Sequence, residues 1–201
     1  MSLQNYFKKF SSSEVQIVGP FFDVDNQNLL KDPIIYVDAG VHFRTQAQGF
    51  SVGDGDSSEI AMDEKLNTKK SYSDLAFVLQ HIPRQFSKIQ LLGFLGHRKD
   101  HELINFAEVH KFLKKSFNTV QIHFDKKIKV LSKGTWDLVI HGSFSIFAFE
   151  EIDLQVSGDC DCQVLAGEVF SALSSQGLSN QGYGEVKIIC NQPLFIFLNP
   201  K

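Results

Sequence analysis

The fold of this chain is best predicted from residues 91–105, LLGFLGHRKDHELIN. The segment completes a buried-strand pattern over residues 88–94, is interrupted by glycines, and continues with apolar residues at helical spacing. A glycine-bearing loop between a strand and a helix favours phosphate binding, because the helix N-terminus offers free N–H groups and partial positive charge. Arg98 and Asp100 add a cation and a carboxylate there, which suggests a metal–nucleotide site. An ordinary strand–loop–helix connection with exposed charges is the alternative.

The first half of the chain alternates strand and helix patterns. Apolar runs at 14–20 and 33–37 predict strands, and residues 73–82 carry apolar side chains at helical spacing before a proline. A further helix is predicted from residue 100 to about 115, and residues 51–59 are predicted to be a loop by composition. Strands that alternate with helices indicate a parallel sheet with helices on its faces.

The pattern changes after Phe117. Short apolar runs, several of them alternating with period two, are separated by turn residues. They lie at 121–124, 136–140, 143–147, 161–165, 185–189 and 194–198. This spacing predicts a β-sandwich or a barrel. We therefore place a boundary near residue 120, with an α/β domain over residues 1–120 and a β domain over residues 121–201.

Composition argues against several functional classes. The chain has 201 residues and a net charge of -3, which argues against a general nucleic-acid-binding or membrane-surface protein. No apolar run approaches the roughly 20 residues of a membrane helix, and the first ten residues are not followed by the apolar core of a signal peptide. Three cysteines without a secretion signal predict reduced thiols. We expect a cytoplasmic protein without a membrane or nucleic-acid partner.

Acidic residues at loop positions form the main candidate site. Five aspartates of the first half qualify: Asp38, Asp54, Asp56, Asp74 and Asp100. Asp38 and Asp100 follow strand patterns, where open α/β sheets bind ligands. The i, i+2 spacing of Asp54 and Asp56 can aim two carboxylates at one hard cation. Mg²⁺ usually takes one or two carboxylates together with substrate phosphates, so the cluster suits a Mg²⁺-bound polyphosphate.

Each acid also has a structural alternative. Asp-Gly-Asp is a common turn composition, Asp74 completes a capping box if Ser71 is the N-cap, and Asp38 can cap the segment after it. No calcium EF-hand loop, no Walker A loop and no G-x-S-x-G nucleophile motif is present in the sequence.

Other polar side chains near these acids are weaker candidates. Lys70 can reach a phosphate, with a surface lysine as the alternative, and His101 lies in the first turn of the predicted helix. In the second half, Ser179 and Asn180 lie in a loop between strand patterns and can hydrogen-bond a heteroaromatic ring. In isolation that loop is an ordinary turn.

Taken in order, these segments resemble the thiamine pyrophosphokinase family. The family motif Asp-Gly-Gly resembles residues 38–40 (DAG), and Gly-Asp-x-Asp-Ser resembles residues 53–57 (GDGDS). A lysine before Thr-Asp-Leu is similar to Lys70 and residues 73–75 (SDL). The motif Gly-x-Arg-x-Asp-His with a later Asn resembles residues 96–101 (GHRKDH) and Asn105, and the Ser-Asn loop resembles residues 179–180. The resemblance runs from about residue 34 to the C-terminus.

The resemblance implies a three-layer α/β/α domain with a mainly parallel sheet, followed by a β-sandwich domain that binds thiamine. It implies transfer of pyrophosphate from Mg-ATP to the thiamine hydroxyl in a homodimer. By the resemblance Asp54, Asp56 and Asp74 hold Mg²⁺ or position the hydroxyl, with Asp100 as a further catalytic acid. The remaining residues contact substrates: Asp38, Lys70, Arg98 and His101 for ATP, and Ser73, Ser179 and Asn180 for thiamine.

The chain departs from the family pattern at several positions. Ala39 replaces a glycine, Gly55 replaces a bulky apolar residue, Ser73 replaces a threonine, and residues 159–175 match poorly. These departures keep two alternatives open: a relative that binds a nucleotide or thiamine derivative without turnover, and a pyrophosphokinase that acts on another alcohol.

Overall fold

The computed structural model describes residues 1–45, 48–96, 98–162 and 169–199. It divides the chain into two compact units, Met1–Phe112 and Leu113–Lys201. The division falls shortly before the boundary predicted near residue 120, and the exact domain limits stay a prediction.

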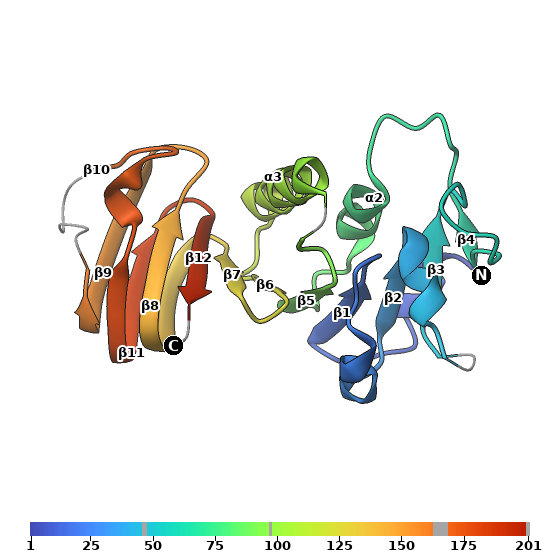
Figure 1. Cartoon of the computed structure of the whole chain (residues 1–201), viewed down its shortest axis with the longest axis horizontal. Coiled ribbons are helices and arrows are strands. Elements are labelled where there is room, and N and C mark those ends of the chain that lie inside the picture. Colours follow the sequence, from blue (N-terminus) through green and yellow to red (C-terminus); the bar gives the residue numbers. More distant parts are fainter. Residues whose placement is uncertain (46–47, 97, 163–168, 200–201) are drawn as a thin grey trace. The chain divides into compact units, whose positions relative to one another are not determined.

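The first unit contains a parallel sheet. Its strands are β1 (Glu14–Val18), β2 (Ile34–Val37), β3 (Phe50–Gly53), β4 (Glu64–Lys65) and β5 (Lys88–Leu92). The order is β5-β1-β2-β3-β4 and every neighbouring pair is parallel (Figure 1). This confirms the predicted parallel α/β class. Because all five strands are parallel, their carboxyl ends share one edge, where such sheets bind ligands.

Helices connect these strands. They are α1 (Leu3–Phe7), α2 (Asp74–His81), α3 (Lys99–Lys115) and the 3-10 helices η1 (Val24–Leu29) and η2 (Asp38–Phe43). The helices predicted at 73–82 and at 100 to about 115 are confirmed. The predicted loop 51–59 is wrong for its first three residues, because residues 51–53 belong to the buried strand β3. Their serine and glycine content is typical of loops, so the strand was not predicted. Its serine, Ser51, is hydrogen-bonded to the carboxylate of Asp63.

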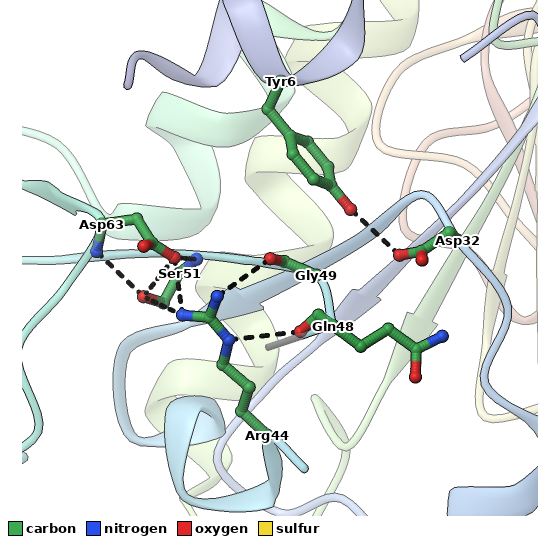
Figure 2. Close-up of polar contacts among 7 residues, drawn as sticks. All are labelled: Tyr6, Asp32, Arg44, Gln48, Gly49, Ser51 and Asp63. Atoms are coloured by element: carbon green, nitrogen blue, oxygen red, sulfur yellow. Dashed lines mark hydrogen bonds and ion pairs between the residues drawn. The ribbon is translucent and has the colours of Figure 1, made fainter. Parts of the chain in front are cut away.

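The core of the first unit surrounds the central strands. Every residue of β2 and β3 is buried, as expected for parallel strands covered on both faces. Helix α1, which the sequence reasoning missed, adds the buried side chains of Leu3, Tyr6 and Phe7. The Tyr6 hydroxyl accepts a hydrogen bond from the Ile34 backbone N–H (3.2 Å) and donates one to Asp32 (3.0 Å; Figure 2). These bonds satisfy the hydroxyl and fasten α1 to the start of β2.

The second unit is antiparallel. Its strands are β6 (Gln121–Phe124), β7 (Ile128–Leu131), β8 (Gly134–Phe147), β9 (Ile152–Asp161), β10 (Val169–Phe170), β11 (Asn180–Cys190) and β12 (Leu194–Asn199). They pair in the order β10-β9-β11-β8-β12-β7-β6. Figure 1 shows the long strands β8, β9, β11 and β12 of this sheet. The all-β class is confirmed, whereas its layering as a sandwich, like the three layers of the first unit, stays a prediction.

Two strand predictions in the second unit need correction. Segments 136–140 and 143–147 are one strand, β8, which continues through Gly142 at a φ of 98° opposite Gly182 of β11. Gly142 was taken as a turn residue between two strands, but a glycine can also lie inside a long strand and adopt an irregular backbone conformation there. In the predicted strand 161–165, Asp161 ends β9, Cys162 follows the strand, and residues 163–165 lie outside the described residues. None of the helices in the described ranges is long and apolar enough to span a membrane.

Candidate active site

The carboxyl edge of the parallel sheet gathers the predicted acids. Asp38 follows β2, Asp54 follows β3, and Asp74 is the first residue of α2. A Cβ atom on Gly53 would lie 3.3 Å from the backbone N of Asp38, so the ends of β2 and β3 are in close contact. Asp38, Asp54, Asp56 and Asp74 are named below as the acid cluster, because the other three carboxylates all raise the pKa of Asp38.

Lys70 provides the positive charge of this cluster. Its ammonium makes a short ion pair with Asp54 and a second ion pair with Asp74 at 2.8 Å. The three side chains are only 9–11% exposed. Burial lowers the pKa of Lys70, but the two carboxylates outweigh it and the pKa is raised. The hydrogen bond from Lys70 lowers the pKa of Asp54, so both partners are held in their charged forms.

Asp38 is the uncompensated member of the cluster. It has a left-handed backbone with a φ of 54°, and its Oδ1 is buried without a hydrogen-bond partner in the described part of the chain. Burial raises the pKa of its carboxyl group, and a hydrogen bond from Ser57 only partly opposes this. Burial also raises the pKa of Asp74, against the effect of Lys70. The cluster therefore holds more negative charge than its lysine neutralises.

Asp54 and Asp56 share a tight turn. The Asp56 N–H donates to Asp54 Oδ1 (3.2 Å), and the Ser57 hydroxyl donates to Asp56 Oδ1 (2.9 Å). Gly55 between them has a φ of 77°, whereas a Cβ atom there would meet nothing nearer than 3.7 Å. Glycine is thus needed for the backbone conformation rather than for space. A residue with a Cβ atom would be strained in this conformation.

A polar clamp holds the base of the loop that carries Asp54 and Asp56. Asp63 Oδ2 accepts hydrogen bonds from Arg44 Nη1 (2.6 Å), the Ser51 backbone N–H (2.9 Å) and the Ser51 hydroxyl (3.1 Å), as Figure 2 shows. The Asp63 N–H donates back to Ser51 Oγ (3.0 Å), and Arg44 also donates to the carbonyls of Gln48 and Gly49. The clamp fixes residue 63 to β3, so residues 54–62 form a loop closed at both ends.

A surface cleft of about 600 Å³ lies along this loop. It is lined by His42 and residues 55–60, so Asp56 belongs to both the cleft and the acid cluster. A cleft of this size can hold a nucleotide-sized ligand. The sequence reasoning missed His42, Arg44 and Asp63, and it quoted Ser57 as part of the motif at residues 53–57 without giving it a role.

The start of α3 binds its own side chains. Arg98 Nε and Nη2 donate to the two carboxylate oxygens of Asp100 (3.0 and 2.6 Å), and both side chains are mostly exposed. Glu102 Oε2 accepts hydrogen bonds from the Gly96 N–H (2.9 Å) and from Lys99 (3.1 Å). In the described residues, Arg98 and Asp100 make no hydrogen bond or ion pair to the acid cluster. A phosphate at this loop would have to displace the pair, which is weak because it is solvated. His101 is exposed in the first turn of α3.

Gly93, which follows strand β5, has a structural role. Gly93 has a φ of 75°, and a Cβ atom there would overlap the backbone of Phe22. Its carbonyl accepts the Phe21 N–H (3.0 Å), so the loops after β1 and β5 are joined at their backbones. Asn105 Nδ2 donates to the Phe94 carbonyl (3.3 Å), which ties α3 to the same loop. Residue 97 lies outside the described residues.

Ser73 has a helix-capping role, and one expectation is corrected. Its hydroxyl accepts the Ala76 N–H (3.0 Å) as the N-cap of α2. Ser71, the predicted N-cap, is exposed and lies two residues before the observed cap; as N-cap it would begin the helix at Tyr72, whereas α2 begins at Asp74. Asp74 therefore lies at the positive end of the helix dipole.

The Ser-Asn pair of the second unit lies where β11 begins. Ser179 is exposed with a φ of 61°, and its N–H donates to Ser145 Oγ (3.1 Å). Asn180 is buried, and its Nδ2 donates to the Gly177 carbonyl (2.8 Å), fastening the turn after η3 (Ser175–Gly177). Ser179 is thus available to a ligand, whereas Asn180 shapes the turn beneath it.

The donor chemistry of the acid cluster fits Mg²⁺. Carboxylate oxygens are the ligands this ion prefers, and the unpartnered Asp38 Oδ1 and the surplus negative charge favour a further cation. No three described acidic, histidine or cysteine side chains, however, converge closely enough to hold a metal ion. Lys70 lies between two of the acids instead.

Solved structures share this fold. No protein-family model matches the chain, and no curated protein matches it. Thiamine pyrophosphokinase from Bacillus subtilis superposes with a TM-score of 0.70 at 19% identity, covering 94% of this chain and 99% of that one. The chain has the thiamine pyrophosphokinase fold. The enzyme from Geobacillus thermodenitrificans gives 0.69 at 17% (94% and 98% covered), and that from Candida albicans gives 0.70 at 12% (95% and 90% covered).

Proposed function

We propose that this chain is a thiamine pyrophosphokinase, which transfers pyrophosphate from Mg-ATP to the hydroxyl of thiamine and releases AMP. The observation that carries the proposal is the gathering of Asp38, Asp54, Asp56 and Asp74 around Lys70 at the carboxyl edge of a sheet with this fold. Identity to the solved enzymes is 12–19%, so the activity is argued from the site rather than from ancestry.

The proposed reaction is an in-line transfer. The thiamine hydroxyl oxygen forms a bond to the β-phosphorus of ATP, and the bond from that phosphorus to the α,β-bridging oxygen breaks. Its electron pair leaves with AMP. Asp74 or Asp100 is the proposed acceptor of the hydroxyl proton. Lys70 and Arg98 would bind phosphate oxygens, and Asp38 and His101 are proposed as further contacts to ATP.

When bound, Mg²⁺ would neutralise the polyphosphate and hold it in register for the transfer. Asp54, Asp56 and Asp74 are the proposed ligands, and the unpartnered Oδ1 makes Asp38 a further candidate. Most of the remaining rate enhancement would come from positioning. The cleft along residues 55–60 is the proposed location of the nucleotide.

Asp56→Asn tests this proposal. The substitution keeps the size of the side chain and the N–H bond to Asp54, so the fold should persist while AMP release from Mg-ATP and thiamine falls by about 100-fold or more. Asp25→Asn, an exposed acid in η1, is the matched control and should retain wild-type turnover. A folded Asp56→Asn variant that releases AMP at the wild-type rate would rule out the proposed role of the acid cluster.

A binding protein without turnover is the second candidate. It is favoured by the ion pairing of Lys70 with Asp54 and Asp74, which leaves no preformed metal site among the described residues. Calorimetry with Mg-ATP and thiamine, run beside the AMP assay, separates the two, since tight binding without AMP release supports the second candidate. A panel of other primary alcohols in the same assay identifies a different acceptor.

The thiamine site and the assembly complete the proposal. Ser179 would contact the thiamine pyrimidine, with Asn180 holding its turn and Ser73 near the acceptor hydroxyl. We propose a homodimer, to be checked by light scattering. The free cysteines are consistent with the proposed cytoplasmic location.

A further inference from the structure

The acid cluster already contains a cation that belongs to the chain. Lys70 contacts the carboxylates of Asp54 and Asp74, and the three side chains are almost fully buried. The backbone N–H of Lys70 donates to the Asn67 carbonyl (3.2 Å), so the residue lies in a hydrogen-bonded turn before α2. This bond fixes the backbone of Lys70, and the two ion pairs hold its ammonium between two of the proposed metal ligands.

The charge of the cluster is nevertheless unbalanced. Lys70 contributes one positive charge against four carboxylates, and one oxygen of Asp38 has no partner among the described residues. A further cation is electrostatically favoured, but two of its ligands are already paired with Lys70. An ammonium and a divalent ion repel each other at this distance, so a divalent ion at Asp54 and Asp74 competes with Lys70 for the two carboxylates.

We propose that Lys70 is the resident counter-ion of the acid cluster, and that a divalent cation binds there only as Lys70 leaves Asp54 and Asp74. The four-carbon side chain of lysine is flexible enough for this exchange. Once released, the ammonium would need another anionic partner, and a phosphate group is suitable. The cluster is thus built for a metal–polyphosphate complex, which supplies both partners at once, rather than for a free metal ion. The identity of that ligand rests on the proposed function, but the competition does not.

The test measures binding of Mn²⁺ alone, as a paramagnetic substitute for Mg²⁺, to the full chain without nucleotide or thiamine. Free Mn²⁺ is followed by electron paramagnetic resonance. Lys70→Met removes the competitor and should bind Mn²⁺ at least about tenfold more tightly than the wild type, since one less positive charge lies in contact with the ligands. Lys70→Arg keeps the charge and should bind as weakly as the wild type.

Lys69→Met is the matched control for charge alone. Lys69 is the exposed neighbour of Lys70, and its backbone N–H donates to Asn67 Oδ1 (2.8 Å). Its loss should change the Mn²⁺ affinity by no more than about twofold, because exposed charges are screened. Equal affinities in Lys70→Met and the wild type, or equal gains in Lys70→Met and Lys69→Met, would overturn the proposal.

A second measurement uses the wild-type chain and needs no variant to fold. Lysine acetylation read by mass spectrometry should label Lys70 slowly in metal-free protein and faster at saturating MgCl₂, whereas Lys69 should be labelled equally in both. A Lys70 rate that does not respond to Mg²⁺ counts against the exchange. Neither readout involves AMP release, so a chain without pyrophosphokinase activity can still show the competition, and an active chain can still lack it.

Discussion

The loop that carries Asp54 and Asp56 should depend on the clamp at its base, and Asp63→Ala tests this. The substitution leaves the buried Ser51 N–H without its acceptor, which costs about 1–3 kcal/mol. It also removes the charged partner of Arg44. Because the Arg44 and Asp63 side chains are 22% and 35% exposed and Arg44 keeps two carbonyl acceptors, this loss adds only about 0.5–1 kcal/mol. The first unit should lose about 1.5–4 kcal/mol in total.

Hydrogen–deuterium exchange of peptides covering β2 and β3 measures this loss in the first unit directly, with urea unfolding by circular dichroism as a second readout. Asp63→Asn keeps one acceptor oxygen and should lose about half as much. Lys88→Met is the matched control, since it removes an ion pair with Glu14 whose side chains are about 40% exposed, and should cost no more than about 1 kcal/mol. If Asp63→Ala is no more damaging than this control, the clamp does not hold the loop.

Three further outcomes follow from individual residues. Burial raises the pKa of the Asp38 carboxyl group above its ordinary value of 3.8, so the ionised form destabilises the fold, and stability rises as pH falls through the raised pKa toward 3.8. Asp38→Asn should therefore stabilise the chain by about 1 kcal/mol at pH 7 and lose this advantage in acid, as measured by urea unfolding at several pH values. Gly93→Ala should cost about 3–5 kcal/mol through overlap and strain, whereas Gly96→Ala, with an open site, should cost only about 1–2. Ser73→Ala should cost about 1 kcal/mol and Ser71→Ala under 0.5, measured by thermal unfolding; the reverse order would restore the cap originally predicted.

Local patterns were enough to predict most of the fold. Strand β2 is buried at every residue and left a continuous apolar run in the sequence, whereas β1 and β5 alternate buried apolar residues with half-buried polar ones. Strand β3 was missed because its second residue is a serine. Ser51 can be buried because its polar groups are hydrogen-bonded to Asp63, twelve residues later in the sequence.

The candidate site was predictable where it follows the strands and not where it depends on distance in space. Asp38 comes directly after the predicted strand β2, so its place at the sheet edge could be predicted. Asp54 comes directly after β3, which was predicted as a loop, and it was found only through its i, i+2 spacing with Asp56. The pairing of Lys70 with Asp54 joins residues sixteen apart and cannot be read from spacing. Arg98 pairs with Asp100, two residues away, and its contact with phosphate stays a prediction.

The strongest argument for a ligand at this edge is that the acid cluster is a poor way to stabilise a protein. Burying several carboxylates around a single ammonium costs more in desolvation than the ion pairs return, and apolar residues of similar size would serve the fold better. The left-handed Asp38 adds backbone strain and an unpartnered oxygen at the same place. The buried carboxylates, the left-handed backbone and the unpartnered oxygen all lie at one sheet edge. Unfavourable features gathered at one place in this way are typical of a functional site, here one that binds a cation-bearing ligand. A stabilising effect of Asp38→Asn combined with loss of AMP release would show that this cost is kept for function.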